Sequence, residues 1–170
     1  KETVGDIDIL VSTQSPEKVI KAFCSMNNVT KVLAEGKTKC SVRVEEGIQI
    51  DLRVVDANHF GAALLYFTGS KEHNIRMRQA AQDRGLKLNE FGLMPETDLT
   101  GLEAAATSLP ANDEADIYQH LGMEYVTPEL REDMGEIEAS LAANLPNLMD
   151  LNDIRGALHN HTLLSDGEAS

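Results

Sequence analysis

The stretch from Asp6 to Val11 constrains the fold more than any other part of the 170-residue sequence. Apolar and acidic residues alternate in it, with Ile7 and Ile9 on one side and Asp6 and Asp8 on the other. This period of two is typical of a half-buried β-strand. Residues i and i+2 of a strand point the same way, so the two carboxylates project from one face.

A helix is expected after this strand, followed by three further strands. Ser15 and Pro16 have the positions of an N-cap and a first helical residue, and the helix should end near Ser25. The turn-forming segments EGK and EEG separate three strand candidates, which are Val29–Ala34, Lys39–Val44 and Ile48–Val55. Residues 1–57 are therefore expected to form a small mixed sheet with a helix packed on it.

After Asp56 the sequence becomes mostly helical. Helices are expected at Asn58–Tyr66, closing at Gly69, at Lys71–Arg84, capped by Gly85, and at Glu114–Leu121. Two short extended pieces, Lys87–Asn89 and Phe91–Met94, suit a β-hairpin. The predicted class is thus α+β, with a second, mostly helical subdomain over residues 58–132.

Residues 133–155 have a different composition, rich in Ala, Asn and acids, with one short helix expected near Ile137–Ala143. This composition predicts a linker. The only cysteines are Cys24 and Cys40, whose spacing fits neither a metal knuckle nor a CxxC motif, and no run of 18 apolar residues occurs. We expect a cytoplasmic monomer with no membrane partner.

The net charge of −13 argues against a nucleic-acid partner, because such proteins usually neutralise phosphates with clustered Lys and Arg. The charge is uneven, however. Residues 71–87 hold five basic and two acidic side chains, and residues 96–138 hold one basic and twelve acidic ones. A basic stripe on an acidic protein is compatible with DNA binding, but a solvated helix face explains it equally well.

A third acid lies on the polar side of another predicted strand, IQIDLRVV, where Gln49, Asp51 and Arg53 alternate with apolar residues. If this strand neighbours the first one, Asp51 joins Asp6 and Asp8. Such carboxylates suit two divalent ions that hold a triphosphate and activate an attacking oxygen. The alternatives are two exposed surface acids on the first strand and, for Asp51, an acid paired with Arg53.

Three segments resemble the family X DNA polymerases in order and spacing: GDIDILV at 5–11, IDLRVV at 50–55 and YFTGSKEHNIRMR at 66–78. The likeness continues through LKLNEFGL at 86–93 and ADIYQHLGMEYVTPELRED at 115–133. It implies a nucleotidyltransferase palm at residues 1–57 and a thumb at residues 58–132. It also implies that Asp6 and Asp8 hold two Mg²⁺ ions, or Mn²⁺, and that Asp51 holds the catalytic ion and helps deprotonate a primer 3′-hydroxyl.

The resemblance assigns further contacts to the incoming nucleotide and to DNA. The turn from Tyr66 to Gly69 would lie against the sugar and leave no room for a 2′-hydroxyl. Lys71, Asn74 and Arg78 follow at i, i+3 and i+7, on one helix stripe. The nucleotide-binding residues so implied are Gly5, Tyr66, Phe67, Thr68, Gly69, Lys71 and Asn74, and the DNA-binding residues are Arg53 and Arg78, the latter at the template minor groove.

The segment DIRGALHNHTLLSDGEAS at 153–170 resembles the first metal motif of the PHP phosphoesterase domains that bacterial family X enzymes carry after their polymerase. It implies that residues 156–170 begin such a domain, with His159, His161 and Asp166 as ligands of Mn²⁺ or Zn²⁺. Other PHP motifs are missing, as are a Gly-Ser triphosphate motif and a helix-hairpin-helix domain. We therefore expect a piece of a longer protein, which can be inactive in isolation.

The predicted function is a DNA-directed DNA polymerase that transfers a nucleotide from a dNTP to a primer 3′-hydroxyl on gapped or primed duplex DNA. Gap filling in base excision repair is the expected setting, with a 3′-5′ exonuclease or phosphoesterase in the same parent protein. Two alternatives stay open. One is another kind of nucleotidyltransferase, and the other is a non-catalytic DNA-binding module of a repair protein, which the acidic segment 96–138 allows.

Overall fold

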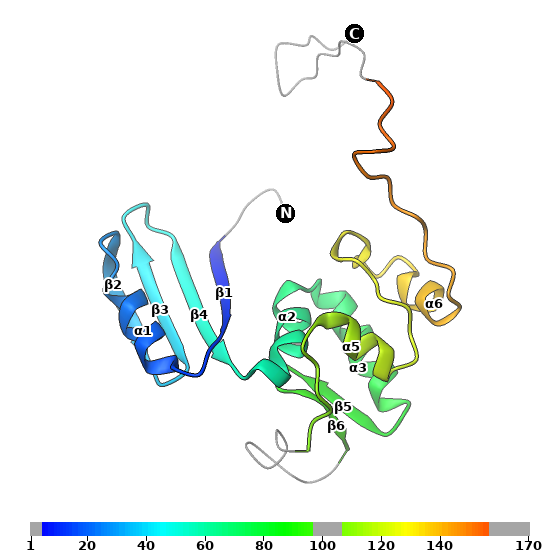
Figure 1. Cartoon of the computed structure of the whole chain (residues 1–170), viewed down its shortest axis with the longest axis horizontal. Helices are drawn as coiled ribbons and strands as arrows, with labels where there is room; N and C mark the ends of the chain where they lie inside the picture. The colour runs from blue at the N-terminus through cyan, green and yellow to red at the C-terminus, as the bar shows by residue number, and fades with distance from the viewer. Residues whose placement is uncertain (1–4, 97–106, 157–170) are drawn as a thin grey trace.

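The computed structural model describes residues 5–96 and 107–156. A four-stranded sheet stands beside a mostly helical body (Figure 1). The sheet comprises β1 (Asp6–Ser12), β2 (Val29–Glu35), β3 (Lys39–Val44) and β4 (Gln49–Val55), in the order β1-β4-β3-β2. β1 and β4 are parallel and the other pairs are antiparallel, so the expected mixed sheet is confirmed.

Helix α1 (Pro16–Cys24) packs on one face of this sheet. Its apolar face meets the even-numbered positions of β3 and β4, and the core so formed comprises Ile20, Phe23, Cys40, Val42, Leu52 and Val54. Pro16 stands at the first turn, as expected. Ser15 holds the N-cap position without a capping side-chain bond, and its backbone N–H donates to Thr13 Oγ1 at 3.1 Å.

The helical body begins with η1 (Ala57–His59), α2 (Phe60–Thr68) and α3 (Lys71–Gln82). A hairpin of β5 (Leu86–Asn89) and β6 (Gly92–Pro95) follows, and then α5 (Glu114–His120), η2 (Pro128–Leu130) and α6 (Glu136–Leu141). Asp113 caps α5 in a reciprocal capping box with Asp116. One core holds these elements together and includes Leu65, Met77, Leu93, Ile117, Tyr118 and Val126.

The interpretation of residues 133–155 as a linker is wrong for the first part of that range. Ile137 of α6 is 4% exposed and belongs to the core of the helical body. Glu136 and Ser140 are buried as well, and the Ser140 hydroxyl donates to the carbonyl of Glu124. An acid-rich composition hid this packing because the buried polar groups have distant partners. None of the helices that the structure describes is long and apolar enough to cross a membrane.

Gly61 marks the closest approach of α2 to the segment before α5. Its N–H donates to the carbonyl of Ala111 at 2.8 Å, and a Cβ at Gly61 would lie 1.9 Å from the carbonyl oxygen of Asp113. We expect Gly61→Ala to lower the free energy of unfolding by about 3 kcal/mol, since the backbones must separate to admit the methyl group. Chemical denaturation measures this change.

The matched control is Gly156→Ala, where an added Cβ meets no atom within 4 Å. Its effect should stay within about 0.5 kcal/mol. Equal stabilities of the two variants would mean that α2 and the Asp113 backbone do not touch.

His73 gives the fold a pH dependence. Burial lowers the pKa of His73, and nearby Arg131 adds to this, more than Glu136 and Asp133 raise it. The native state therefore keeps the ring neutral at pH values where the unfolded chain, with a usual value of 6.5, is protonated. This contribution to stability is present above that value and is lost as pH falls below it.

We expect His73→Gln to weaken this pH dependence, measured as the free energy of unfolding between about pH 7.5 and about pH 5.5. His120→Gln is the control, because His120 is exposed and its ring Nε2 lies 2.9 Å from the carbonyl oxygen of Pro110. A wild-type curve that matches the His73→Gln curve over this range would contradict the assignment.

Candidate active site

The three predicted acids lie on two adjacent strands of the sheet. The parallel register places Asp8 of β1 opposite Asp51 of β4, and Asp6 opposite Gln49. Paired residues of neighbouring strands share a face, so these side chains project from the face that α1 does not cover. Asp6 and Asp8 are exposed and Asp51 is half-buried. The predicted neighbourhood of the two strands is therefore observed.

The acids affect one another electrostatically. Partial burial, followed by the negative charges of Asp6 and Asp51, raises the pKa of Asp8, against the opposing effect of Arg53 and Lys39. Like charges on adjacent strand positions repel, and a bound cation would remove that repulsion. This face of the sheet is thus suited to positive ions.

Gln49, which sequence reasoning did not single out, holds Asp51. Its amide nitrogen lies 3.2 and 3.3 Å from the two carboxylate oxygens of Asp51. The alternative in which Asp51 pairs with Arg53 is not observed among the described residues. Arg53 instead places its guanidinium over the Phe67 ring, with 4.7 Å between its Cζ and the ring centroid, and its buried Nε has no hydrogen-bond partner in the described part of the chain.

The acids have the donor atoms and the strand positions that a metal site needs. Their side chains are not arranged as a complete ligand set. Carboxylate oxygens are the ligands that Mg²⁺ prefers, and it commonly binds through one or two of them with water and substrate oxygens. No group of three or more His, Cys, Asp or Glu side chains among residues 5–96 and 107–156 is arranged closely enough to hold an ion.

A hollow of about 210 Å³ lies between the acid-bearing strands and α2, and its lining includes Asp8, Arg53, Phe67 and Thr68. Asp8 of the sheet and the C-terminal residues of α2 therefore line the same hollow. Arg53 and Phe67 connect them through their stacking contact.

A larger groove of about 840 Å³ runs over the start of α3. Seven predicted nucleotide- or DNA-binding residues line it: Tyr66, Phe67, Thr68, Gly69, Lys71, Asn74 and Arg78. Phe67 and Thr68 belong to both linings, so the groove adjoins the hollow beside Asp8. Gly5 is exposed at the start of the sheet and lines neither space.

The turn from α2 to α3 is fixed by local hydrogen bonds. Gly69 ends α2 with φ of 74°, a value that glycine adopts readily, and its peptide bond to Ser70 is cis. The Ser70 hydroxyl caps α3 by accepting from the N–H of His73 at 3.2 Å. Asn74 Nδ2 donates to the carbonyl of Tyr66 at 2.8 Å, which ties the helix stripe to the turn.

Arg131 is a second residue that the sequence did not reveal. It is among the residues that line the larger groove, and its side chain is fully buried. The guanidinium donates to Glu114 at 2.6 Å and to the Val126 carbonyl at 3.0 Å. The Arg131 carbonyl accepts from the N–H of Ser70 at 3.4 Å, so this cluster supports the first turn of α3.

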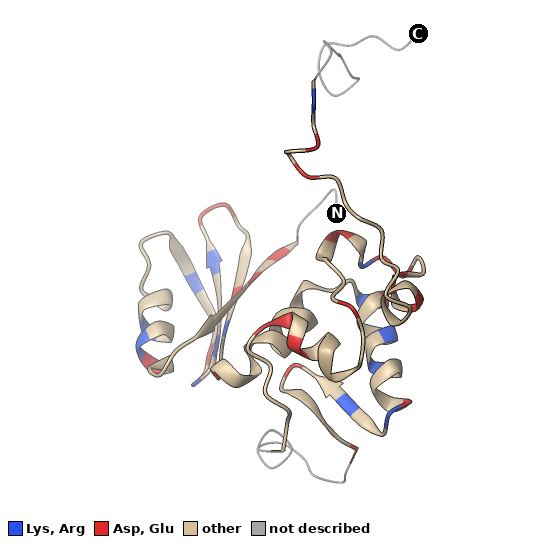
Figure 2. Ribbon diagram, turned by 45° about the vertical axis from the view of Figure 1, so that its right-hand side comes forward, with Lys and Arg blue, Asp and Glu red and all other residues tan. Residues whose placement is uncertain are grey.

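β1 carries acidic side chains, and α3 carries more basic than acidic ones (Figure 2). This distribution suits a ligand that carries both metal ions and phosphates. The predicted ligands His159, His161 and Asp166 lie outside the described residues.

Comparison with known proteins agrees with this architecture. Residues 63–132 match the family model of the DNA polymerase beta thumb. The chain is 37% identical over 172 residues to the DNA polymerase/3′-5′ exonuclease PolX of Bacillus subtilis (strain 168), which covers the whole chain but 29% of that relative. It is 27% identical over 139 residues to the repair DNA polymerase X of African swine fever virus, covering 77% of the chain and 75% of the viral protein.

A solved structure has the same fold. The ternary P/T complex of Leishmania infantum polymerase beta superposes with a TM-score of 0.62 at 26% identity, and covers 76% of this chain and 62% of that one. A mixed sheet bearing strand carboxylates, joined to a thumb of the polymerase beta type, defines the nucleotidyltransferase class. Within that class, the chain belongs to the family X DNA polymerases.

Proposed function

We propose that the protein containing this chain is a DNA-directed DNA polymerase that extends a primer 3′-hydroxyl with dNTPs and fills gaps in base excision repair. The observation that carries the proposal is the register that sets Asp8 opposite Asp51 beside the groove lined by Asn74 and Arg78. The chain spans under a third of the length of the Bacillus relative, so the activity of the whole protein is part of this proposal.

In this proposal Asp6, Asp8 and Asp51 hold divalent ions, with Mg²⁺ as the physiological choice and Mn²⁺ as a substitute. Bound ions neutralise charge on the triphosphate and lower the pKa of the attacking hydroxyl. Asp51, which accepts a hydrogen bond from the Gln49 amide, would receive the primer proton. Gln49 would then keep the Asp51 carboxylate in one orientation.

The groove over α3 would take the nucleotide and the template. Tyr66, exposed at the end of α2, and Phe67 would lie against the sugar, while Asn74 would contact the base pair being formed. Lys71 and Arg78 carry positive charge into the same groove, where they would meet phosphate and the template strand. Gly5 would approach the triphosphate, and Arg53 would support the DNA-bound arrangement through Phe67.

A nucleotidyltransferase of another kind would share the strand acids but would have no use for this groove. The similarity to polymerases extends over the whole chain in the Bacillus relative, which favours template-directed synthesis. A 3′-5′ exonuclease activity, which the printed name of that relative includes, would belong to a PHP domain that uses Mn²⁺ or Zn²⁺ and begins at residues 156–170. The protein would act as a monomer in the bacterial cytoplasm.

The proposal predicts that Asp51→Ala in the full-length protein lowers the single-turnover rate of nucleotide addition by about 1,000-fold or more. The variant should bind primed DNA almost as tightly as the wild type, because Asp51 contacts no phosphate. Rapid-quench kinetics and fluorescence anisotropy measure the two quantities. Equal losses of rate and of DNA affinity would indicate a structural acid.

Arg78→Ala should behave differently. A minor-groove contact checks base-pair geometry, so the ratio of kcat/KM for correct and incorrect nucleotides should fall by about 10-fold, with a smaller change in DNA affinity. Arg84→Ala is the control, since Arg84 lies outside the groove and its side chain bonds the Ala80 carbonyl. A uniform loss of affinity with selectivity intact would make Arg78 a plain phosphate contact.

A further inference from the structure

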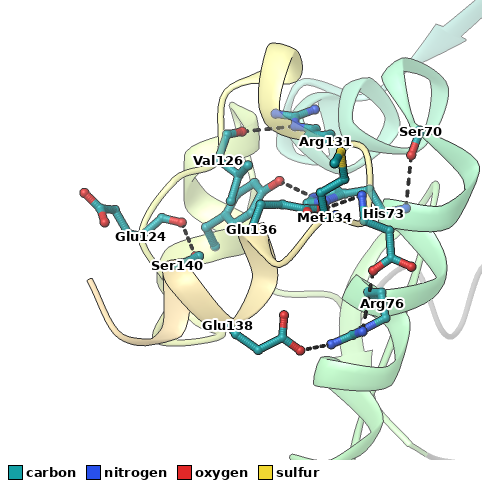
Figure 3. Close-up of polar contacts among 12 residues, drawn as sticks. Ser70, His73, Arg76, Glu124, Val126, Arg131, Met134, Glu136, Glu138 and Ser140 are labelled. Atoms are coloured by element: carbon teal, nitrogen blue, oxygen red, sulfur yellow. Dashed lines mark hydrogen bonds and ion pairs between the residues drawn. The ribbon is translucent and has the colours of Figure 1, made fainter. Parts of the chain in front are cut away.

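Helix α6 lies beyond the matched thumb segment of residues 63–132, yet it packs against α3, the helix that carries Asn74 and Arg78. Figure 3 shows the polar contacts between the two elements. Ile137 anchors α6 in the common core with 4% exposure. The segment after the thumb match is therefore in direct contact with the helix that bears the nucleotide-selecting stripe.

Two side-chain contacts of different kinds join α6 to α3. Glu136 Oε1 lies 2.7 Å from His73 Nδ1, and both residues are buried. Glu138 pairs with Arg76 at the surface, where their side chains are 62% and 39% exposed. An exposed ion pair contributes little to stability, whereas a buried polar group that loses its partner is costly. The contact between Glu136 and His73 is thus the one expected to fix α3.

The His73 ring is held on both sides. Its Nε2 lies 2.8 Å from the hydroxyl of Tyr118 on α5, opposite the bond to Glu136. Glu136 in turn accepts from the backbone N–H groups of Asp133 and Met134 at 3.0 and 2.7 Å. Any rotation of α3 would break bonds that no solvent can replace at this depth.

The Glu136 carboxylate stays ionised in this setting. Burial alone would raise the pKa of Glu136, but hydrogen bonds from His73 and from backbone N–H groups outweigh it and lower the pKa. Glu136 is therefore a charged acceptor for the His73 N–H throughout the neutral range.

His73 immediately precedes Asn74 and lies five positions before Arg78 on the same helix. Because the helix backbone is stiff, the orientation of His73 sets the direction in which Asn74 and Arg78 enter the groove. Helix α3 has a buried face, which includes His73 and Met77, and another face that lines the groove with Asn74 and Arg78. Both faces therefore rotate together.

We propose that Glu136 is a positioning residue for nucleotide selection: acting through His73, it fixes the rotation of α3 and hence the placement of Asn74 and Arg78. This inference rests on the proposed polymerase function. It makes residues 133–141 part of the apparatus that checks the nascent base pair, although they follow the thumb match.

The test compares Glu136→Ala, Glu136→Gln and the control Glu138→Gln in the full-length protein. We expect Glu136→Ala to lower the ratio of kcat/KM for correct and incorrect nucleotides by about 10-fold, chiefly through slower correct incorporation. Glu136→Gln keeps an oxygen that accepts from His73 and should recover most of the selectivity. Glu138→Gln, on the exposed side of the same helix, should leave it unchanged. Equal selectivity of Glu136→Ala and Glu138→Gln would overturn the inference.

Coupling to Arg78 separates positioning from general destabilisation. If Glu136 acts through the α3 stripe, adding Glu136→Ala to Arg78→Ala should reduce selectivity by less than about twofold further. Losses that multiply would show that Glu136 acts independently of Arg78, and would contradict the inference. Thermal melts set the assay temperature below the transition of the least stable variant.

Amide hydrogen exchange needs no nucleotide, so it tests whether Glu136 fixes α3 independently of the proposed function. Exchange of the α3 amides should accelerate by about 10-fold in Glu136→Ala and in His73→Gln, a substitution that keeps a polar side chain. It should not accelerate in Glu138→Gln. Unchanged exchange in both variants would overturn the inference even if the protein polymerises DNA. A wild-type protein that incorporates no nucleotide would refute the polymerase proposal and leave the exchange result as the measure of the Glu136 contact.

Discussion

The candidate site depends on the parallel pairing of β1 with β4. This pairing alone brings Asp8 beside Asp51, since the two strands are separated in sequence by α1, β2 and β3. A slip of one residue would turn the acids of one strand toward the apolar face. The register is held by apolar residues of that face, such as Leu52 and Val54. It persists although burial and then the charges of Asp6 and Asp51 raise the pKa of Asp8.

In the helical body, the groove is supported by charged side chains that are buried inside the protein. Arg131 is fully buried, and its guanidinium is tolerated because Glu114 neutralises it and the Val126 carbonyl accepts a further bond. The rings of Tyr118 and Tyr125 flank it. The cluster holds residue 131 where its carbonyl meets Ser70, so the polar interior supports the turn at which α3 enters the groove.

Local pattern predicted most of the sheet and little of the buried polar network. The strand Lys39–Val44 has the expected bounds, and the strand of Asp51 starts one residue later than expected. Pairing of Glu136 with His73, 63 positions away, left no local signal, and the acid-rich composition around it favoured a linker. The bond of Gln49 to Asp51 joins residues i and i+2, so strand alternation already placed both on one face.

The same network changes what the acidic segment 96–138 means for DNA binding. Taken as a solvated surface, its charge would repel a phosphate backbone. Several of its described acids instead have partners within the protein: Glu114 neutralises Arg131, Glu136 bonds His73, and Asp113 caps α5. Glu138 is exposed but pairs with Arg76 on α3. The charges of Glu114 and Glu138, each paired with an arginine, contribute little field at the groove, which Lys71 and Arg78 line. The net charge of −13 already counts both members of each pair, so it reflects the unpaired acids of the whole chain and not the local charge at the groove.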